Sequence, residues 1–159
     1  MAKSILLTGA GGGGTIEIIR SLRKTGNYRI IGVDASPYAY GLELCDAGYV
    51  IPFGSSPQFE SRMSEILQKE KPDYLVPLVD EEILPTHALA SKFKIKLIAP
   101  SVDFCKLSLD KFQTFESLRK AGISAPETVL ATHEFDYKTP VIIKPRQGRG
   151  SRGFKKISS

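Results

Sequence analysis

The chain has 159 residues, enough for one domain or for one domain and part of another, and 42% of them are hydrophobic and 25% charged, as in a globular protein. No apolar run approaches the roughly 20 residues that a membrane-spanning helix needs, which excludes a helical membrane protein. The first apolar run, residues 5–7, is too short for a secretory signal. We therefore expect a cytoplasmic protein without a membrane partner.

The net charge of +5 is unevenly distributed along the chain. Residues 141–159 contain six Lys and Arg side chains and no acidic residue, and without these six the rest of the chain carries a net charge of −1. The protein is therefore not basic throughout, as a protein that coats duplex DNA would be. The local cluster of cations predicts one anion site, for which small phosphates and a nucleic-acid backbone are both candidates.

Residues 4–100 alternate between strand and helix patterns. Short apolar or β-branched runs bounded by turn residues predict strands, and apolar side chains at helical spacing, such as Phe59, Met63, Ile66 and Leu67, predict helices. The expected strands are 4–8, 28–34, 47–53, 74–79 and 96–99, and the expected helices are 15–24, 57–71 and 81–93. This order predicts an α/β fold, a doubly wound parallel sheet with helices on both faces.

The pattern changes after Pro100. The expected elements are helices at 102–106 and 109–121, a weak strand at 128–131, and hairpin strands at 140–144 and 154–157. Because an isolated hairpin is marginally stable in water, we expect a second domain that begins near residues 115–125 and is cut off. The expected division is a first domain at residues 1–115 and the start of another at 116–159.

A first glycine run follows the first expected strand and opens the first helix. Gly9-Ala10-Gly11-Gly12-Gly13-Gly14 matches G-x-G-x-x-G, and Asp34 ends the second strand, 20 residues beyond Gly14, where a ribose-binding acid would stand. One interpretation is an NAD(P)-dependent oxidoreductase domain that holds its dinucleotide with this run and Asp34. The other is a loop that passes the strand closely into the helix and binds no dinucleotide.

A second glycine-rich segment follows the strand that ends at Lys144. Because side chains alternate along a strand, Lys144 is expected on the same face as Ile142, at the base of the loop. The loop glycines, Gly148, Gly150 and Gly153, let the backbone offer N–H groups to phosphate oxygens, which Lys144 would neutralise. It is not a Walker A loop, because no G-K-[ST] follows. The alternative is a solvated basic hairpin that binds RNA.

Three motifs in colinear order resemble the ATP-grasp superfamily. The segment from Asp110-Lys111 through Gly122-Ile123 to Ala125-Pro126-Glu127-Thr128 is similar to the form DK-x-x-T…L…GI-x-x-P-x-T that leads into ATP-grasp domains. The sequence VIIKPRQGRGSRG resembles the strand, Lys-Pro and glycine-rich loop of that fold. Upstream, GVDASPYAYGLELCDAGYVIP and LVPLVDEEILP resemble the N-terminal part of the carbamoyl-phosphate-synthase-large-subunit-like branch. The resemblance implies a Rossmann-like pre-ATP-grasp domain followed by the start of an ATP-grasp domain.

The resemblance implies ATP as the cofactor. Lys111 and Lys144 would contact its phosphates, and the glycine-rich loop would fold over the β and γ phosphates. The implied nucleotide-binding residues are Lys111, Lys144, Gly148, Arg149, Gly150, Ser151, Arg152 and Gly153. The residues alone leave alternatives open, because Lys111 could be a surface lysine beside Asp110 and Lys144 a solubilising lysine on an edge strand.

The resemblance also implies that the first domain helps to form the acceptor-substrate side of the cleft, with Gly11, Gly12, Asp80, Glu81 and Glu82 as candidates. The three acids follow the fourth expected strand, at the edge where open α/β sheets bind ligands, and could orient an amine. Alternatively they stabilise the start of the next helix, with Asp80 as its N-cap.

The whole enzyme implied by the resemblance uses ATP to activate a carboxylate as an acyl phosphate, from which an amine displaces phosphate. The family's carboxylates for Mg²⁺ lie downstream of this segment, so the chain alone is expected to complete no metal site and not to turn over. It is expected to be a truncated product, one half of a split protein or an excerpt of a longer chain. Its expected partners are ATP, a small carboxylate or amine substrate, and the missing C-terminal half or a second copy, but not nucleic acid. Cys45 and Cys105 are expected to be free thiols and not metal ligands.

Overall fold

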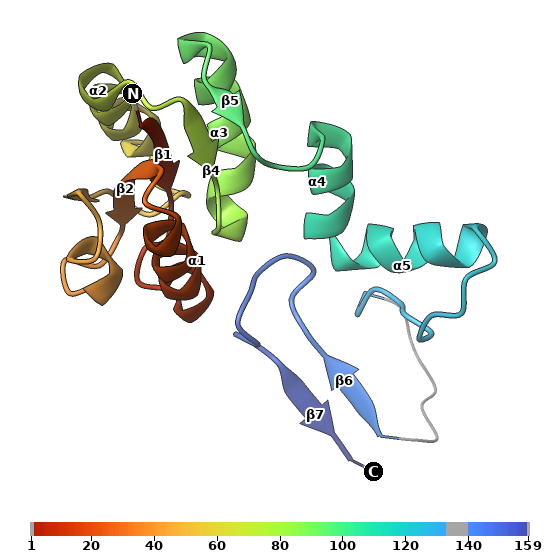
Figure 1. Cartoon of the computed structure of the whole chain (residues 1–159). Helices are drawn as coiled ribbons and strands as arrows, with labels where there is room; N and C mark the ends of the chain where they lie inside the picture. Colours follow the sequence, from red (N-terminus) through yellow and green to blue (C-terminus); the bar gives the residue numbers. More distant parts are fainter. Residues whose placement is uncertain (1, 133–139, 159) are drawn as a thin grey trace. The chain divides into compact units, whose positions relative to one another are not determined.

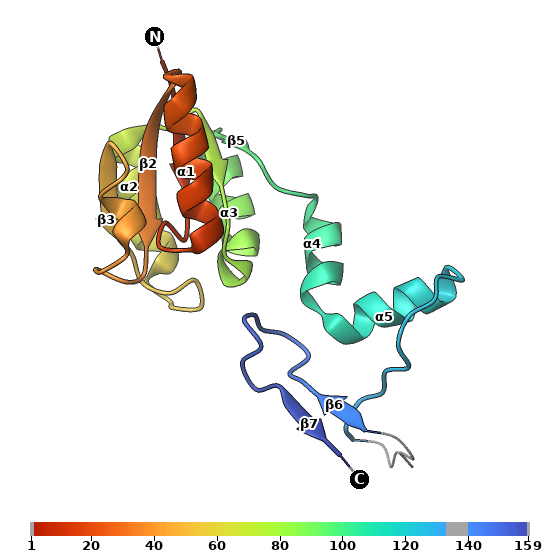
Figure 2. The ribbon, with the colours of Figure 1, turned by 60° about the horizontal axis from the view of Figure 1, so that its bottom comes forward.

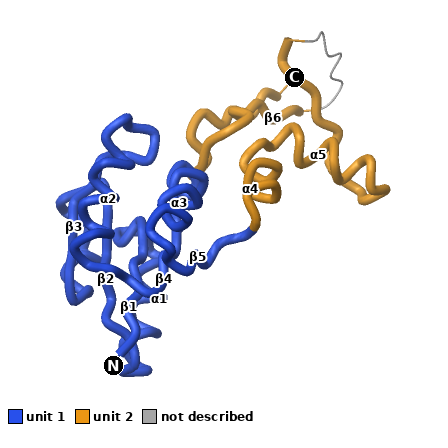
Figure 3. Tube along the Cα trace, turned by 90° about the horizontal axis from the view of Figure 1, so that it is seen from above, with its two compact units in different colours: residues 1–100 blue, residues 101–159 orange. Residues whose placement is uncertain are grey.

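The computed structural model describes residues 2–132 and 140–158. The chain forms two compact units, Met1–Pro100 and Ser101–Ser159, called here unit 1 and unit 2 (Figure 3). The expected domain boundary at residues 115–116 lies within unit 2 and stays a prediction about the whole protein. Within the described residues, no helix combines the length and apolarity needed to cross a membrane.

Unit 1 contains a five-stranded sheet in the order β3-β2-β1-β4-β5, in which every neighbouring pair is parallel (Figure 1). The strands are β1 (Lys3–Leu7), β2 (Tyr28–Asp34), β3 (Ala47–Val50), β4 (Tyr74–Val76) and β5 (Lys96–Leu97). The chain runs outward from β1 to β3 and then returns to β4 on the other side of β1, so the strand order reverses between β1 and β4. Open α/β sheets bind ligands beyond the carboxyl ends of the strands at such a point.

Helices cover both faces of this sheet, which confirms the expected doubly wound α/β fold (Figure 2). They are α1 (Gly13–Thr25), α2 (Phe59–Glu70) and α3 (Asp80–Phe93), and a 3-10 helix, η1 (Tyr40–Leu42), precedes β3. Successive side chains of β1 point to opposite faces, so Ile5 and Leu7 pack with Ile19 of α1, whereas Leu6 packs with α2 and α3. The α2 side forms the larger core, in which Phe59 and Met63 are almost fully buried.

Three strands of unit 1, β3, β4 and β5, end two or more residues earlier than the sequence predicts. β4 was expected to reach residue 79 but ends at Val76, because Pro77 has no N–H and Leu78 donates its N–H to the Thr8 hydroxyl at 3.0 Å instead of to a strand. β3 ends at Val50 and β5 contains only two residues. The chain therefore leaves the sheet early at the edge where the candidate substrate residues lie.

Unit 2 contains two helices and an antiparallel hairpin. They are α4 (Val102–Leu109), α5 (Lys111–Lys120), β6 (Val141–Ile143) and β7 (Lys155–Ile157). Each helix begins at a capping side chain: Ser101 accepts the N–H of Phe104 at 3.3 Å, and Asp110 accepts the N–H of Gln113 at 3.1 Å. Asp110 thus ends α4 and starts α5, which divides the helical segment in two.

The strand expected at residues 128–131 is wrong. These residues are irregular in the structure, and the Thr128 hydroxyl donates to the Pro126 carbonyl at 3.0 Å, which closes a local turn. A strand is stable only when its backbone pairs with a neighbour, and Pro126 supplies no donor at the start of this segment. The weak apolar pattern here does not correspond to a strand.

Candidate functional site

The main candidate site lies in unit 2, where the start of α5 meets the loop between β6 and β7. The backbone N–H of Lys111 donates to the carbonyl of Arg146 at 3.0 Å, and the Lys111 Nζ donates to the carbonyl of Gly148 at 2.7 Å. The first lysine predicted from the sequence and the glycine-rich loop, 37 positions apart, are therefore joined by direct hydrogen bonds.

Asp110 and Arg146 form a bidentate ion pair beside these contacts. The Arg146 Nε donates to both carboxylate oxygens of Asp110, at 2.8 and 2.7 Å, and a second guanidinium nitrogen lies 2.7 Å from Oδ2. The hydrogen bond from Arg146, more than the one from the Gln113 N–H, lowers the pKa of Asp110 below its usual value, although burial opposes the shift. The side chain of Asp110 is only 7% exposed, so this carboxylate is held by its partners inside a basic segment.

Two aromatic side chains of α5 support two cations of the opposite segment. The Lys144 Nζ lies 4.6 Å from the centroid of the Phe115 ring, and the Arg146 guanidinium carbon lies 5.6 Å from that of Phe112. Phe112 and Phe115 are three apart and so share a face of α5, and the two cations follow the end of β6. Lys144 therefore lies at the base of the loop, as expected, but against an aromatic ring of α5.

Sequence reasoning missed three residues of this site, Arg146, Phe112 and Phe115. The two phenylalanines lie in the helix expected at residues 109–121, and none of the described residues of α5 is buried. A signal was present: Asp110 precedes a helix that carries aromatics at i and i+3, and the hairpin carries cations at i and i+2. The sequence did not show which face of the helix contacts which part of the hairpin.

The glycine-rich loop exposes its backbone. Gly148, Gly150, Ser151 and Gly153 have φ values of +123°, +63°, +55° and +73°, which a chain of ordinary residues rarely adopts. A Cβ added at Gly148 or Gly150 would meet no atom within 4 Å, so these glycines leave space beside the backbone. All residues of this loop that the sequence predicts to bind nucleotide, including Arg149 and Arg152, are exposed.

The start of the first glycine run, in unit 1, is in close contact with the segment after β2. Asp34 accepts the N–H of Gly11 on Oδ2 at 2.7 Å and the N–H of Ser36 on Oδ1 at 2.8 Å. A Cβ added to Gly41 would lie 1.8 Å from the carbonyl oxygen of Ala10, so the segment after β2 is in close contact with the run. Asp34, which the oxidoreductase interpretation assigns to a ribose, thus has a structural role with both oxygens engaged.

Of the substrate-side candidates, Gly11 and Gly12 lie in the loop after β1, and the three acids form the first turn of α3, which follows the loop after β4. The loops touch, because a Cβ at Gly9 would meet the Val79 side chain at 2.5 Å. The alternative interpretation of Asp80 as the N-cap of the next helix is wrong, because Val79 holds that position without a side-chain cap and Asp80 is the first helical residue. Glu81 is exposed, whereas Glu82 is 3% exposed and packs against Gly54. The three acids therefore do not share one accessible surface.

The helix α1 begins at Gly13, and its N-cap residue, Gly12, offers no side-chain cap. A Cβ added at Gly13 or Gly14 would meet nothing within 4 Å, so the start of this helix borders open space. Gly11 is different, since a Cβ there would lie 2.9 Å from Ala39. Of the two substrate-side glycines, Gly12 borders the open start of the helix and Gly11 is packed against the segment after β2.

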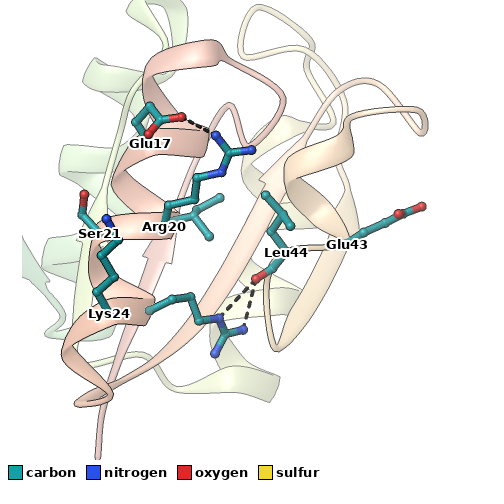
Figure 4. Close-up of a pocket in the computed structure, with 8 residues that line it drawn as sticks. Glu17, Arg20, Ser21, Lys24, Glu43 and Leu44 are labelled. Carbon is teal, nitrogen blue, oxygen red and sulfur yellow. Dashed lines mark hydrogen bonds and ion pairs between the residues drawn. The ribbon is translucent and has the colours of Figure 1, made fainter.

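A cleft of about 490 Å³ lies between α1 and the segment Glu43–Leu44, away from all the residues predicted from the sequence (Figure 4). Arg20 pairs with Glu17 at 2.6 Å, and Arg23 donates to the Leu44 carbonyl and pairs with Asp46 at 2.8 Å. These arginines tie α1 to the segment before β3, and we assign the cleft no ligand.

Neither metal ligation nor reactive thiol chemistry is indicated in the described part of the chain. Residues 2–132 and 140–158 contain no group of three or more His, Cys, Asp or Glu side chains that could hold a metal ion. Both cysteines are free thiols, and burial raises the pKa of the Cys45 thiol to about 11, so it stays protonated near neutral pH.

Comparison with known families gives one match over most of unit 1. The family model described as "PylC-like, N-terminal domain" matches residues 5–101. Among curated proteins, the chain is 28% identical over 150 residues to a carbamoyl-phosphate synthase from Methanobrevibacter smithii, which covers 87% of this chain and 39% of that protein.

Two solved structures resemble nearly the whole chain in fold. N5-carboxyaminoimidazole ribonucleotide synthetase from Thermotoga maritima has a TM-score of 0.72 at 24% identity and covers 99% of this chain and 41% of that one. N5-carboxyaminoimidazole synthetase from Staphylococcus aureus, complexed with ADP, has a TM-score of 0.72 at 15% identity and covers 100% of this chain and 43% of that one. The chain thus spans under half the length of each of these relatives.

Proposed function

Because the chain belongs to the family of PylC-like N-terminal domains, we propose that it is the N-terminal part of an ATP-dependent ligase and binds ATP phosphates in unit 2. Lys111, Lys144 and the backbone of the glycine-rich loop would hold the phosphates. The proposal is supported by the fold that the chain shares with ATP-grasp relatives, one of which was solved with ADP.

The observation that carries the proposal is the hydrogen bond from the Lys111 Nζ to the Gly148 carbonyl, 2.7 Å long. It brings a cation to a loop whose backbone is exposed and whose glycines leave room beside it. An ammonium group has three N–H donors, so the contact with Gly148 leaves two for phosphate oxygens. The carboxylate of Asp110 is neutralised by Arg146 and does not oppose an anion at this position.

The residues of unit 2 fit phosphate chemistry of the ligase type. Bound ATP would supply a γ-phosphoryl group to a substrate carboxylate, with ADP as leaving group, and an amine would then displace phosphate and lose a proton to give an amide-type bond. Lys111 and Lys144 would stabilise the charge on the phosphate oxygens, and the loop would exclude water from them. The identity of the carboxylate and the amine is left open by these residues.

Turnover is proposed to need more than these 159 residues. The relatives are more than twice as long as the chain, and phosphoryl transfer needs divalent cations that bridge the phosphates. The carboxylates that hold Mg²⁺ are proposed to lie in that further part, supplied by the same polypeptide, a separate chain or a second copy. Asp80 and Glu81 of unit 1 are proposed to face the amine-bearing substrate.

ATP binding can be tested by following backbone amide resonances while ATP is added up to millimolar concentration. We expect shifts in residues 148–153, and we expect Lys111→Met and Lys144→Met each to weaken binding by about ten- to a hundredfold, because a charged hydrogen bond contributes roughly 1.5–3 kcal/mol. Lys120→Met, at the exposed end of α5, is the matched control and should bind as the wild type does.

Other ligands in the same titration test the competing interpretations. Shifts caused by NAD in residues 9–14, abolished in Gly11→Ala and absent with ATP, would establish the oxidoreductase domain instead. Binding of a short RNA that weakens steeply with salt, without any response to ATP, would establish the basic hairpin.

A further inference from the structure

We propose that Asp110 and Arg146 are a positioning pair, which holds the base of the glycine-rich loop against α5 so that Lys111 and the loop N–H groups face the same phosphates. The inference rests on the proposed nucleotide site in unit 2 and adds two residues to it. Neither residue is proposed to touch the nucleotide, and both act through Lys111 and Gly148.

Arg146 differs from the other cations of the basic segment because its guanidinium is already engaged. It makes two donor contacts from Nε and one from a terminal nitrogen to Asp110, and it stacks over Phe112. A planar fork bound in this way has a fixed direction, whereas a lysine would form a single contact with no fixed plane. The geometry therefore indicates that Arg146 holds the backbone at the base of the loop in position and does not bind an anion.

The pair sets the position of two backbone segments at once. Asp110 is the N-cap of α5, so its carboxylate orients the helix that begins with Lys111. Arg146 is one residue beyond Pro145 and two before Gly148, and its carbonyl accepts the Lys111 N–H at 3.0 Å. The ion pair and this backbone bond hold residues 110–111 and 146 together, next to the loop.

The consequence for Lys111 is a restrained ammonium group. Its Nζ donates to the Gly148 carbonyl, so the same loop that offers N–H groups to an anion also orients the cation that would neutralise it. A group that is ordered before binding loses less conformational freedom when the ligand arrives. Breaking the ion pair removes this order without substituting any side chain that is proposed to bind phosphate.

Two conservative variants test the inference. Asp110→Asn keeps a good N-cap for α5 but removes the charge, and Arg146→Lys keeps the charge but removes the fork. We expect each variant to accelerate hydrogen exchange of the Lys111 amide by about tenfold or more. We also expect each to weaken ATP binding by about tenfold, that is, to raise the Kd by about one decade, because the contact that orders Lys111 is lost. The helical circular dichroism signal of each variant should stay that of the wild type.

The double variant and a matched control separate positioning from a general effect. Asp110→Asn combined with Arg146→Lys should weaken binding no more than either change alone, because both break the same contact. Arg119→Lys is the control, since it alters an exposed arginine of α5 that pairs with Glu116 three residues earlier. It should change neither exchange nor binding.

Whether Asp110→Asn weakens or tightens ATP binding distinguishes a positioning role of Arg146 from a role as a phosphate ligand. If Arg146 were itself a phosphate ligand, release from Asp110 would tighten ATP binding, and that result would overturn the inference. Wild-type affinity and unchanged exchange of the Lys111 amide in both variants would overturn it as well. If the wild-type chain itself shows no response to millimolar ATP, the proposed function fails first and the positioning role fails with it, an outcome distinct from the other two.

Discussion

Gly41→Ala is expected to destabilise unit 1 strongly. A Cβ at this position would lie 1.8 Å from the carbonyl oxygen of Ala10 and 2.7 Å from its carbonyl carbon. Both are backbone atoms, so relief requires the glycine run or the segment after β2 to move. We expect a loss of about 4 kcal/mol or more, a large part of the roughly 5–15 kcal/mol that stabilises a domain.

The measurement is the midpoint of thermal or urea unfolding followed by circular dichroism. A loss of that size lowers the thermal midpoint by roughly 16–30 °C in a domain of about 100 residues. Gly13→Ala is the matched control, because its Cβ meets nothing within 4 Å at the start of α1 and should change stability by no more than about 1 kcal/mol. Equal midpoints for the two variants would contradict the close contact between Gly41 and Ala10.

Phe59→Ala is expected to produce the other large loss of stability. Phe59 begins α2, is 1% exposed and belongs to the larger of the two cores of unit 1. Truncation of a buried phenylalanine leaves a cavity that the strands and α3 cannot fill, which costs about 3–5 kcal/mol.

Urea unfolding of Phe59→Ala should be compared with that of Phe53→Ala. Phe53 is 67% exposed, so its truncation should change stability by no more than about 0.5 kcal/mol. If both variants unfold at the same urea concentration as the wild type, α2 does not pack on the sheet in the way described. If both lose several kcal/mol, Phe53 is covered in the protein.

The two glycine runs differ in their contacts, although the sequence shows both as possible phosphate loops. In the first, Gly11 is packed against Ala39 and its N–H is donated to Asp34. In the second, Gly148 and Gly150 border open space. Asp34 thus has a structural role at the first run, which the sequence could not show because it depends on how the segment after β2 packs against that run.

The resemblance of the sequence to the N-terminal part of ATP-grasp enzymes is confirmed by the family match to residues 5–101 and by relatives whose fold covers nearly the whole chain. The site residues inferred from that resemblance stay a prediction. The structure supports them in one respect, since it joins Lys111 to the loop. Val79 and not Asp80 caps α3, which corrects the alternative interpretation of Asp80 as an N-cap.

The strands and helices of unit 1 could be predicted from the sequence alone, because their apolar patterns are local. Alternating apolar runs and helical periodicity predicted each of its five strands and three helices, and β2 has the predicted bounds of 28–34. The early end of β4 and the absence of a strand at residues 128–131 were not predicted, because a strand is decided by whether a neighbour accepts its hydrogen bonds.

The contacts that assemble the candidate site could not be predicted from the sequence and are seen only in the folded chain. The ion pair of Asp110 with Arg146 spans 36 positions, and the stacking of Lys144 on Phe115 joins a helix face to a strand end. Periodicity tells which residues of one element share a face, but it carries no information on which face of another element they meet. Charges that look alike in the sequence, such as Lys144 and Arg146, therefore have different partners in the folded chain.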